Sequence, residues 1–287
     1  MVLEALTSNR ITVTAPDGLH LAGEVHGPAD GRPIVFLHGG GQSRAAWRGA
    51  AKRIGEAGYK ACTMDLRGHG DSDWSENMGY GFDDYVGDLA AVIEALGGRP
   101  ATIVGASLGG HIALLTAARY PEQVCVLMMA DVTPWIDEDS GDAMRAELRA
   151  ANRGFASVDE ASAMVSRLRG TPPPAGGSGG LVRHLRRGED GRFYFRWDVR
   201  LMNDALLRGG GEGGLFQMAA ASLRVPVLVM RAEHSTLTSP EQVAAFRMVH
   251  TDVEEVMIAG AGHMVSGDVN DVYADAIMAY LAAASTE

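Results

Sequence analysis

The chain has 287 residues, of which 46% are hydrophobic, so it can bury the core of one large domain or of one domain with an insertion. Its net charge of −11 argues against a nucleic-acid partner, because phosphate binding needs a basic face. No apolar stretch approaches the roughly 20 residues of a membrane helix.

Cysteine content and the start of the sequence bear on the compartment. The only two cysteines, Cys62 and Cys125, form neither a disulfide framework nor a zinc pattern. The first residues lack the basic and apolar regions of a secretory signal. We therefore expect a cytoplasmic protein that acts on a small molecule, without nucleic acid or membrane as a partner. Both a monomer and a homodimer remain open.

Strand-like and helix-like segments alternate through the first half of the chain. After a hairpin-like pair around Pro16 to Gly18, short apolar runs end in glycines or acids, and amphipathic runs follow them. The expected strands are 33–38, 59–64, 101–106 and 124–131, and the expected helices are 45–58, 82–98 and 108–120. Short apolar strands alternating with helices predict a parallel sheet covered on both faces.

This alternation stops at residue 132 and resumes near residue 223. The interval contains two glycine-rich stretches, 170–180 and 209–214, which favour flexible connections. Strands are expected again at 225–232 and 253–258, with helices at 240–250 and 268–284. We expect a core formed by residues 1–131 and 223–287, and a cap formed by residues 132–222.

The segment Gly105-Ala106-Ser107-Leu108-Gly109 is a G-x-S-x-G motif between an expected strand and an expected helix. In that context the serine lies on a tight turn that exposes its hydroxyl, and the flanking glycines let strand and helix approach closely. We predict that Ser107 is a nucleophile and that the Leu108 N–H donates to an oxyanion.

The run His38-Gly39-Gly40-Gly41 follows an earlier strand and favours a second oxyanion donor. We place Gly40 first and Gly41 second, and expect His38 to be structural. His263 follows the last apolar strand and precedes the final helix, where a neutral imidazole can take the serine proton and return it to the leaving group.

With these motifs in this order, the chain resembles the α/β-hydrolase superfamily over nearly its whole length. The stretch Asp65–Asp73, DLRGHGDSD, looks like a family loop in which Arg67 and Asp71 are structural. The resemblance implies an α/β fold: an eight-stranded, mostly parallel sheet with a helical cap inserted between two core strands. It leaves the substrate open, because one fold hosts many chemistries.

Family members usually carry a catalytic acid after the strand that here ends near Ala232, but Ser235 and Thr236 occupy the expected positions. Asp131 ends the strand after the nucleophile helix, beside Ser107 at the same sheet edge. The resemblance implies that a minority of relatives draw their acid from this strand end. We predict Asp131 as the acid; Glu233 and a site without a working acid are the alternatives.

The interval 132–222 also contains acids, aromatic residues and arginines whose places can be predicted. Asp137, Glu138 and Asp139 are expected to face solvent. Trp135 follows the Asp131 strand and is expected to wall the pocket, together with Tyr194 and Trp197. Core packing of the cap is the alternative for the aromatic run 193–197. The arginines around it form a solvated face, or one of them holds a substrate carboxylate.

These residues predict a serine hydrolase that needs no cofactor or metal and cleaves a small carboxylic ester, lactone or amide-like substrate through an acyl-enzyme on Ser107. The first alternative keeps the same residues but cleaves a C–C bond, or forms a peracid as haloperoxidase-like enzymes do. The second is a hydrolase-derived binding protein with weak activity. The displaced acid gives that alternative its weight.

Overall fold

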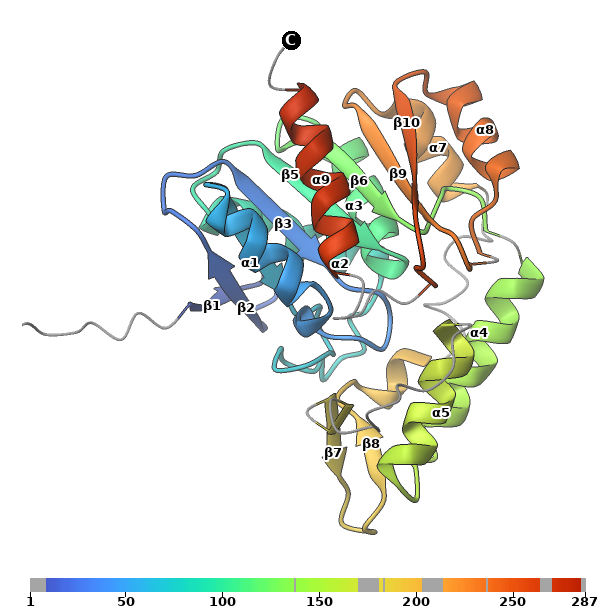
Figure 1. The fold of residues 1–287 in the computed structure, drawn as a ribbon. Coiled ribbons are helices and arrows are strands. Elements are labelled where there is room, and N and C mark those ends of the chain that lie inside the picture. Colours follow the sequence, from blue (N-terminus) through green and yellow to red (C-terminus); the bar gives the residue numbers. More distant parts are fainter. Residues whose placement is uncertain are drawn as a thin grey trace, which may run out of the picture.

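The computed structural model describes residues 9–136, 138–169, 181–182, 184–202, 214–235, 237–263 and 270–284. They contain an eight-stranded sheet in the order β1-β2-β4-β3-β5-β6-β9-β10 (Figure 1). Strands β1 and β2 run antiparallel to their neighbours, and the others are parallel. This confirms the predicted sheet. The strands are β1 (Arg10–Thr14), β2 (His20–His26), β3 (Pro33–Leu37), β4 (Lys60–Met64), β5 (Ala101–Ala106), β6 (Val124–Ala130), β9 (Val227–Ala232) and β10 (Val253–Ile258).

Helices cover both faces of this sheet, as Figure 1 shows. On one face α1 (Arg48–Glu56) packs against α9 (Asn270–Ala284). On the other, α3 (Leu108–Arg119) lies between α2 (Phe82–Ala95) and α7 (Leu215–Ser222), and α7 contacts α8 (Pro240–Val249). The described helices include none that is long and apolar enough to cross a lipid bilayer.

Side-chain alternation along the central strands divides the core into two layers. In β3, which is buried throughout, Ile34 and Phe36 join the cluster beneath α1 and α9. Val35 and Leu37 join the cluster on the opposite face. Burial of both faces explains why the central strands are continuous apolar runs.

The inserted part lies below the sheet in Figure 1, between β6 and β9 in the chain. It contains α4 (Glu138–Ala151), α5 (Val158–Arg169), a hairpin of β7 (Leu185–Arg187) and β8 (Phe193–Phe195), and the short 3₁₀ helix η3 (Val199–Met202). The stretches 170–180 and 209–213, with Asp137 and Arg183, lie outside the described residues.

Helix α7 falls within the predicted cap but packs in the helical layer of the core. Phe216 lies against Phe82 of α2 and against His111 of α3. The boundary at residue 222 therefore stays a prediction, and the packing favours assigning α7 to the core. The glycine-rich stretch before α7 carried no periodicity from which that assignment could be made.

Candidate active site

Ser107 occupies the turn between β5 and α3 with φ 48° and ψ −116°. Such a conformation is unfavourable for an L-residue and costs about 1–3 kcal/mol. The turn is tight enough that a Cβ on Gly105 would clash with the backbone of Gly109. The amides of Gly110 and His111 donate to the Ser107 carbonyl at 2.9 and 3.1 Å, which begins the helix.

The structure brings Asp131 and His263 into direct contact. His263 Nδ1 lies 2.7 Å from Asp131 Oδ2, and the two side chains are 10% and 0% exposed. The Ala232 N–H donates to the other carboxylate oxygen, Oδ1, at 3.1 Å. Both carboxylate oxygens of the buried Asp131 therefore have partners, one on His263 and one on the neighbouring strand β9.

The register of the sheet places Ser107, the predicted nucleophile, beside this pair. Ala106 of β5 pairs with Ala130 of β6, so Ser107 and Asp131 are the next residues at the same edge. No hydrogen bond joins the Ser107 hydroxyl to His263 within the described part of the chain. Bonds between nucleophile and base are often long before substrate binds.

Glu233, the alternative acid, has different partners. Its Oε2 accepts the Gly260 N–H at 2.8 Å and lies 4.0 Å from His234 Nε2, and its side chain is 45% exposed. Ser235 accepts the Leu237 N–H at 3.1 Å, and Thr236 lies outside the described residues. The geometry therefore favours Asp131 over Glu233 as the partner of His263.

The glycine loop lies against the serine turn. A Cβ on Gly39 would be 3.4 Å from Ser107 Cβ, and one on Gly40 would be 3.8 Å from Leu108 Cδ2. Gly39 donates its N–H to Gln42 Oε1 at 3.1 Å. Among the described residues, the N–H groups of Gly40 and Leu108 have no hydrogen-bond partner, so both can serve a ligand.

The expectation for Gly41 needs correction. Its N–H donates to His69 Nε2 at 3.1 Å and is therefore not free to bind an oxyanion. Gly41 has φ +75°, and a Cβ there would lie 2.6 Å from the Trp197 ring. Glycine is required at position 41 because of its positive φ and the close Trp197 ring, and not because its N–H binds an oxyanion.

His38 and His69 are buried, and their rings lie 5.0 Å apart. Each donates from Nδ1 to a carbonyl, that of Gly39 for His38 and that of Arg67 for His69. Burial lowers the pKa of His38 to about 4. Burial and the neighbouring His38 ring lower the pKa of His69 to about 3. Both rings are neutral near pH 7, and the structural role predicted for His38 agrees with its contacts.

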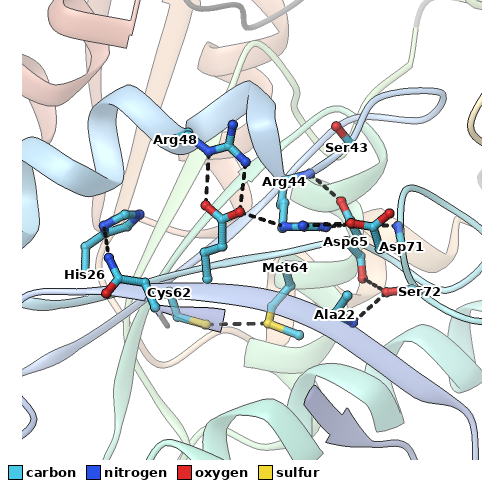
Figure 2. Close-up of polar contacts among 12 residues, drawn as sticks. Ala22, His26, Ser43, Arg44, Arg48, Cys62, Met64, Asp65, Asp71 and Ser72 are labelled. Carbon is cyan, nitrogen blue, oxygen red and sulfur yellow. Dashed lines mark hydrogen bonds and ion pairs between the residues drawn. The ribbon is translucent and has the colours of Figure 1, made fainter. Parts of the chain in front are cut away.

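A charged cluster surrounds Arg44, which follows the glycine loop in the chain; Figure 2 shows Arg44 with Asp65 and Asp71. The Arg44 guanidinium bonds Asp65, Asp71 and Glu24, and Asp65 also accepts the Arg44 N–H at 2.6 Å. The hydrogen bond from Arg44 lowers the pKa of Asp71. Sequence reasoning gave Asp71 a loop-fixing role but missed Arg44, although an arginine just after a glycine run and two acids within DLRGHGD were available signals.

The three aromatic residues predicted to bind substrate are not brought together. Trp197 is buried, packs on Gly41 and stacks on Phe195 with ring centroids 4.5 Å apart. The Tyr194 hydroxyl instead donates to Asp190 at the turn of the β7–β8 hairpin. Trp135 lies near α8, with its ring 6.2 Å from that of Phe246. Of these three described residues, Trp197 is the one that contacts the glycine loop.

His111 was missed by the sequence reasoning. It lies four residues after Ser107 on α3, donates from Nε2 to the Thr133 carbonyl at 3.2 Å and stacks on Phe216 with centroids 4.0 Å apart. Burial lowers its pKa to about 4. His111 thus links the nucleophile helix to the loop that follows Asp131. Its spacing from Ser107 was the one available signal.

The described residues include no group of three His, Cys, Asp or Glu side chains arranged to hold a metal ion. A model of the α/β-hydrolase fold matches residues 32–153 of the chain. The 2-(acetamidomethylene)succinate hydrolase of Mesorhizobium japonicum is 30% identical over 237 residues, which cover 81% of this chain and 82% of that protein. The chain belongs to the α/β-hydrolase family.

Further relatives of this α/β hydrolase extend the similarity. An esterase of Mycobacterium tuberculosis is 29% identical over 246 residues, covering 82% of this chain and 78% of the esterase. The crystal structure of E-2-(acetamidomethylene)succinate hydrolase matches with a TM-score of 0.80 and 26% identity, over 95% of this chain and 98% of that one. These names support hydrolysis as the reaction class of this α/β hydrolase.

Proposed function

We propose that this α/β hydrolase cleaves a small carboxylic ester, lactone or amide-like substrate through an acyl-enzyme on Ser107. The observation that carries the proposal is the 2.7 Å contact between His263 and a fully buried Asp131, at the sheet edge where Ser107 also lies. A carboxylate that accepts Nδ1–H orients the imidazole and stabilises the imidazolium that forms when Nε2 takes a proton.

In the first half of the reaction, His263 Nε2 removes the hydroxyl proton while Ser107 Oγ attacks the substrate carbonyl. The N–H groups of Gly40 and Leu108 bind the developing oxyanion, and each such donor contributes about 10²–10³ to kcat. His263 then protonates the leaving alcohol or amine, and the acyl group remains on Ser107.

In the second half, His263 accepts a proton from water while the water oxygen attacks the acyl carbonyl. The same two N–H groups bind the second oxyanion, and the returned proton restores the serine hydroxyl. Every proton moves between the substrate, water and residues of this chain, so the proposed steps use neither a metal nor a cofactor.

The amide-like part of the substrate class rests on one relative. The Mesorhizobium protein is named for a substrate that bears an acetamidomethylene group on a succinate. We extend the amide-like chemistry, and not that substrate itself, to this chain. We also propose that the cap selects substrates, with Trp197 as its contribution beside the glycine loop, and that the protein is cytoplasmic.

A fluorophosphonate probe tests the nucleophile. The native protein should be labelled on Ser107, and Ser107→Ala should lose all labelling together with aryl-ester hydrolysis. The matched control is Ser157→Ala, since the Ser157 hydroxyl accepts the Glu160 N–H at the start of α5, away from the Ser107 turn. Labelling that survives in Ser107→Ala would contradict the assignment, and an unlabelled native protein would favour a binding role without hydrolysis.

A further inference from the structure

We infer that His69 is a positioning residue of the oxyanion hole: by accepting the Gly41 N–H, it holds the glycine loop so that the Gly40 N–H faces the reacting carbonyl. This inference rests on the proposed function. In this role His69 acts through the backbone of the glycine loop and does not itself touch the substrate or Ser107.

The first step of the argument concerns the successive amides of the loop. The Gly39 N–H is bound by Gln42 Oε1 and the Gly41 N–H by His69 Nε2, both at 3.1 Å. The Gly40 N–H lies between these two fixed points and has no partner among the described residues. Because peptide units are planar, anchoring the amides on both sides restricts the direction of the one between them.

The second step concerns the protonation of His69. A carbonyl oxygen can only accept, so the 3.0 Å contact with the Arg67 carbonyl requires a proton on Nδ1. Nε2 of the neutral ring is then an acceptor, as the Gly41 N–H requires. His69 is 1% exposed, and burial lowers its pKa to about 3, so this state persists near pH 7.

The third step concerns the rigidity of the support. The loop that carries His69 holds the glycine loop at a second point, because Asp65 accepts the Arg44 N–H at 2.6 Å. Asp65 also accepts the Asp71 N–H at 2.9 Å, as Figure 2 shows. This bond closes the segment 65–71, which contains His69. His69 and Asp65, which lie on one loop, thus accept the N–H groups of Gly41 and Arg44, which lie three residues apart on the other.

The cap adds a contact on the same glycine. Residues 196–198 pair with residues 68–70: the Gly70 N–H donates to the Arg196 carbonyl and the Asp198 N–H to the Gly68 carbonyl, each at 2.7 Å. This pairing lays the Trp197 ring on Gly41. Gly41 is therefore held by a hydrogen bond from the core and by packing from the cap.

Two variants of His69 separate hydrogen bonding from packing. His69→Gln keeps an acceptor on a side chain of similar reach, whereas His69→Leu removes it. We expect His69→Leu to lower kcat about 10- to 100-fold on an aryl ester, below the full loss of a donor, with KM changed less than about 3-fold. An aryl trifluoromethyl ketone, which adds to serine as a tetrahedral adduct, should bind more weakly by the same factor. His69→Gln should keep most of the native kcat and most of the native affinity for the ketone.

Hydrogen exchange of residues 39–44, followed by mass spectrometry, needs no turnover. His69→Leu should speed exchange there, and His69→Gln should not. The matched control is Asp131→Asn, which should abolish most turnover and leave this exchange unchanged. The inference would be overturned if His69→Leu kept the kcat, the inhibitor affinity and the exchange rate of the native protein. It would also be overturned if His69→Leu and His69→Gln lost kcat equally and in proportion to a fall in melting temperature. If Ser107→Ala shows that the proposed hydrolysis is wrong, the exchange result still decides whether His69 holds Gly41.

Discussion

Strands β6 and β9 are neighbours in the sheet and end at the same edge, yet they end differently. Asp131 after β6 is fully buried, with one oxygen on His263 and the other on the Ala232 N–H. Glu233 after β9 is 45% exposed and bonds the Gly260 N–H. Strand β9 thus contributes a backbone amide to Asp131, while its own acid turns to a different partner. If Asp131 is the triad acid, as we propose, its enclosure and its complete hydrogen bonding decide that role more than its place in the chain does.

Asp131→Asn tests the β6 end most directly. Asparagine keeps the size of the side chain but cannot stabilise an imidazolium as a carboxylate does, so we expect kcat to fall by about 10⁴. The measurement is aryl-ester hydrolysis at pH 7, with the melting temperature as control for folding. A variant that keeps more than a tenth of native kcat would remove Asp131 from the mechanism.

Gly110→Ala tests whether the loop after β6 must lie tightly on the nucleophile helix. A Cβ on Gly110 would clash with Val132 Cγ1, next to Asp131, and we expect a loss of about 1–3 kcal/mol in the free energy of unfolding together with reduced kcat.

The matched control is Gly87→Ala within α2, where the new Cβ would make an ordinary 3.4 Å contact with Pro16. It should gain up to about 1 kcal/mol from helix propensity and keep native kcat. Urea unfolding measures both variants. Equal stability of the two would show that Val132 gives way freely.

Acid should destabilise the fold near the end of β6, because the His111 ring beside the Thr133 carbonyl is buried and burial disfavours its charged form. Burial lowers the pKa of His111 to about 4 in the folded state, against about 6.5 when unfolded. Below pH 6.5 the unfolded chain therefore binds more protons, so this contribution is complete above pH 6.5 and declines as the pH falls towards 4.

The drop in unfolding free energy between pH 7 and pH 5 should consequently be about 2 kcal/mol smaller in His111→Gln than in the native protein. Urea unfolding at the two pH values gives both numbers. An identical pH dependence in the variant would mean that His111 accepts its proton at the same pH folded and unfolded.

Glu233→Gln should have the smallest effect. The amide oxygen can still accept the Gly260 N–H, and substitutions at partly exposed positions usually change stability by less than about 0.5 kcal/mol. We expect kcat within about 2-fold of native on the same ester. A 100-fold loss would exchange the roles assigned to the two strand ends.

Several features of this site follow from local sequence patterns. The parallel sheet, the GASLG turn and the order of the motifs depend on periodicity and on residues adjacent in the chain. The absence of an acid at Ser235 and Thr236 directed attention to Asp131, and the structure places that carboxylate on His263. Its catalytic role stays a prediction until it is measured.

Features set by distant residues were not predictable in this way. Gly40 and Gly41 are equivalent in sequence, and His69, 28 positions away, makes the difference by binding only one of their amides. For the aromatic run 193–197 the sequence held a usable signal that our prediction did not apply. Alternation along a strand puts Phe195 and Trp197 on one side and Tyr194 on the other. The stacked and buried rings show that Phe195 and Trp197 do share a side.

The backbone at Asp131 has φ 50°, a conformation that costs most side chains about 1–3 kcal/mol but that Asp, Asn and Gly tolerate well. We therefore expect this position to accept few replacements during divergence. A lineage that abandons the acid is expected to pass through Asn or Gly, and both leave the turn intact. Homologues that carry Asn or Gly here would be the natural place to look for members that have exchanged hydrolysis for binding, and a single reversal to Asp should return the chemistry.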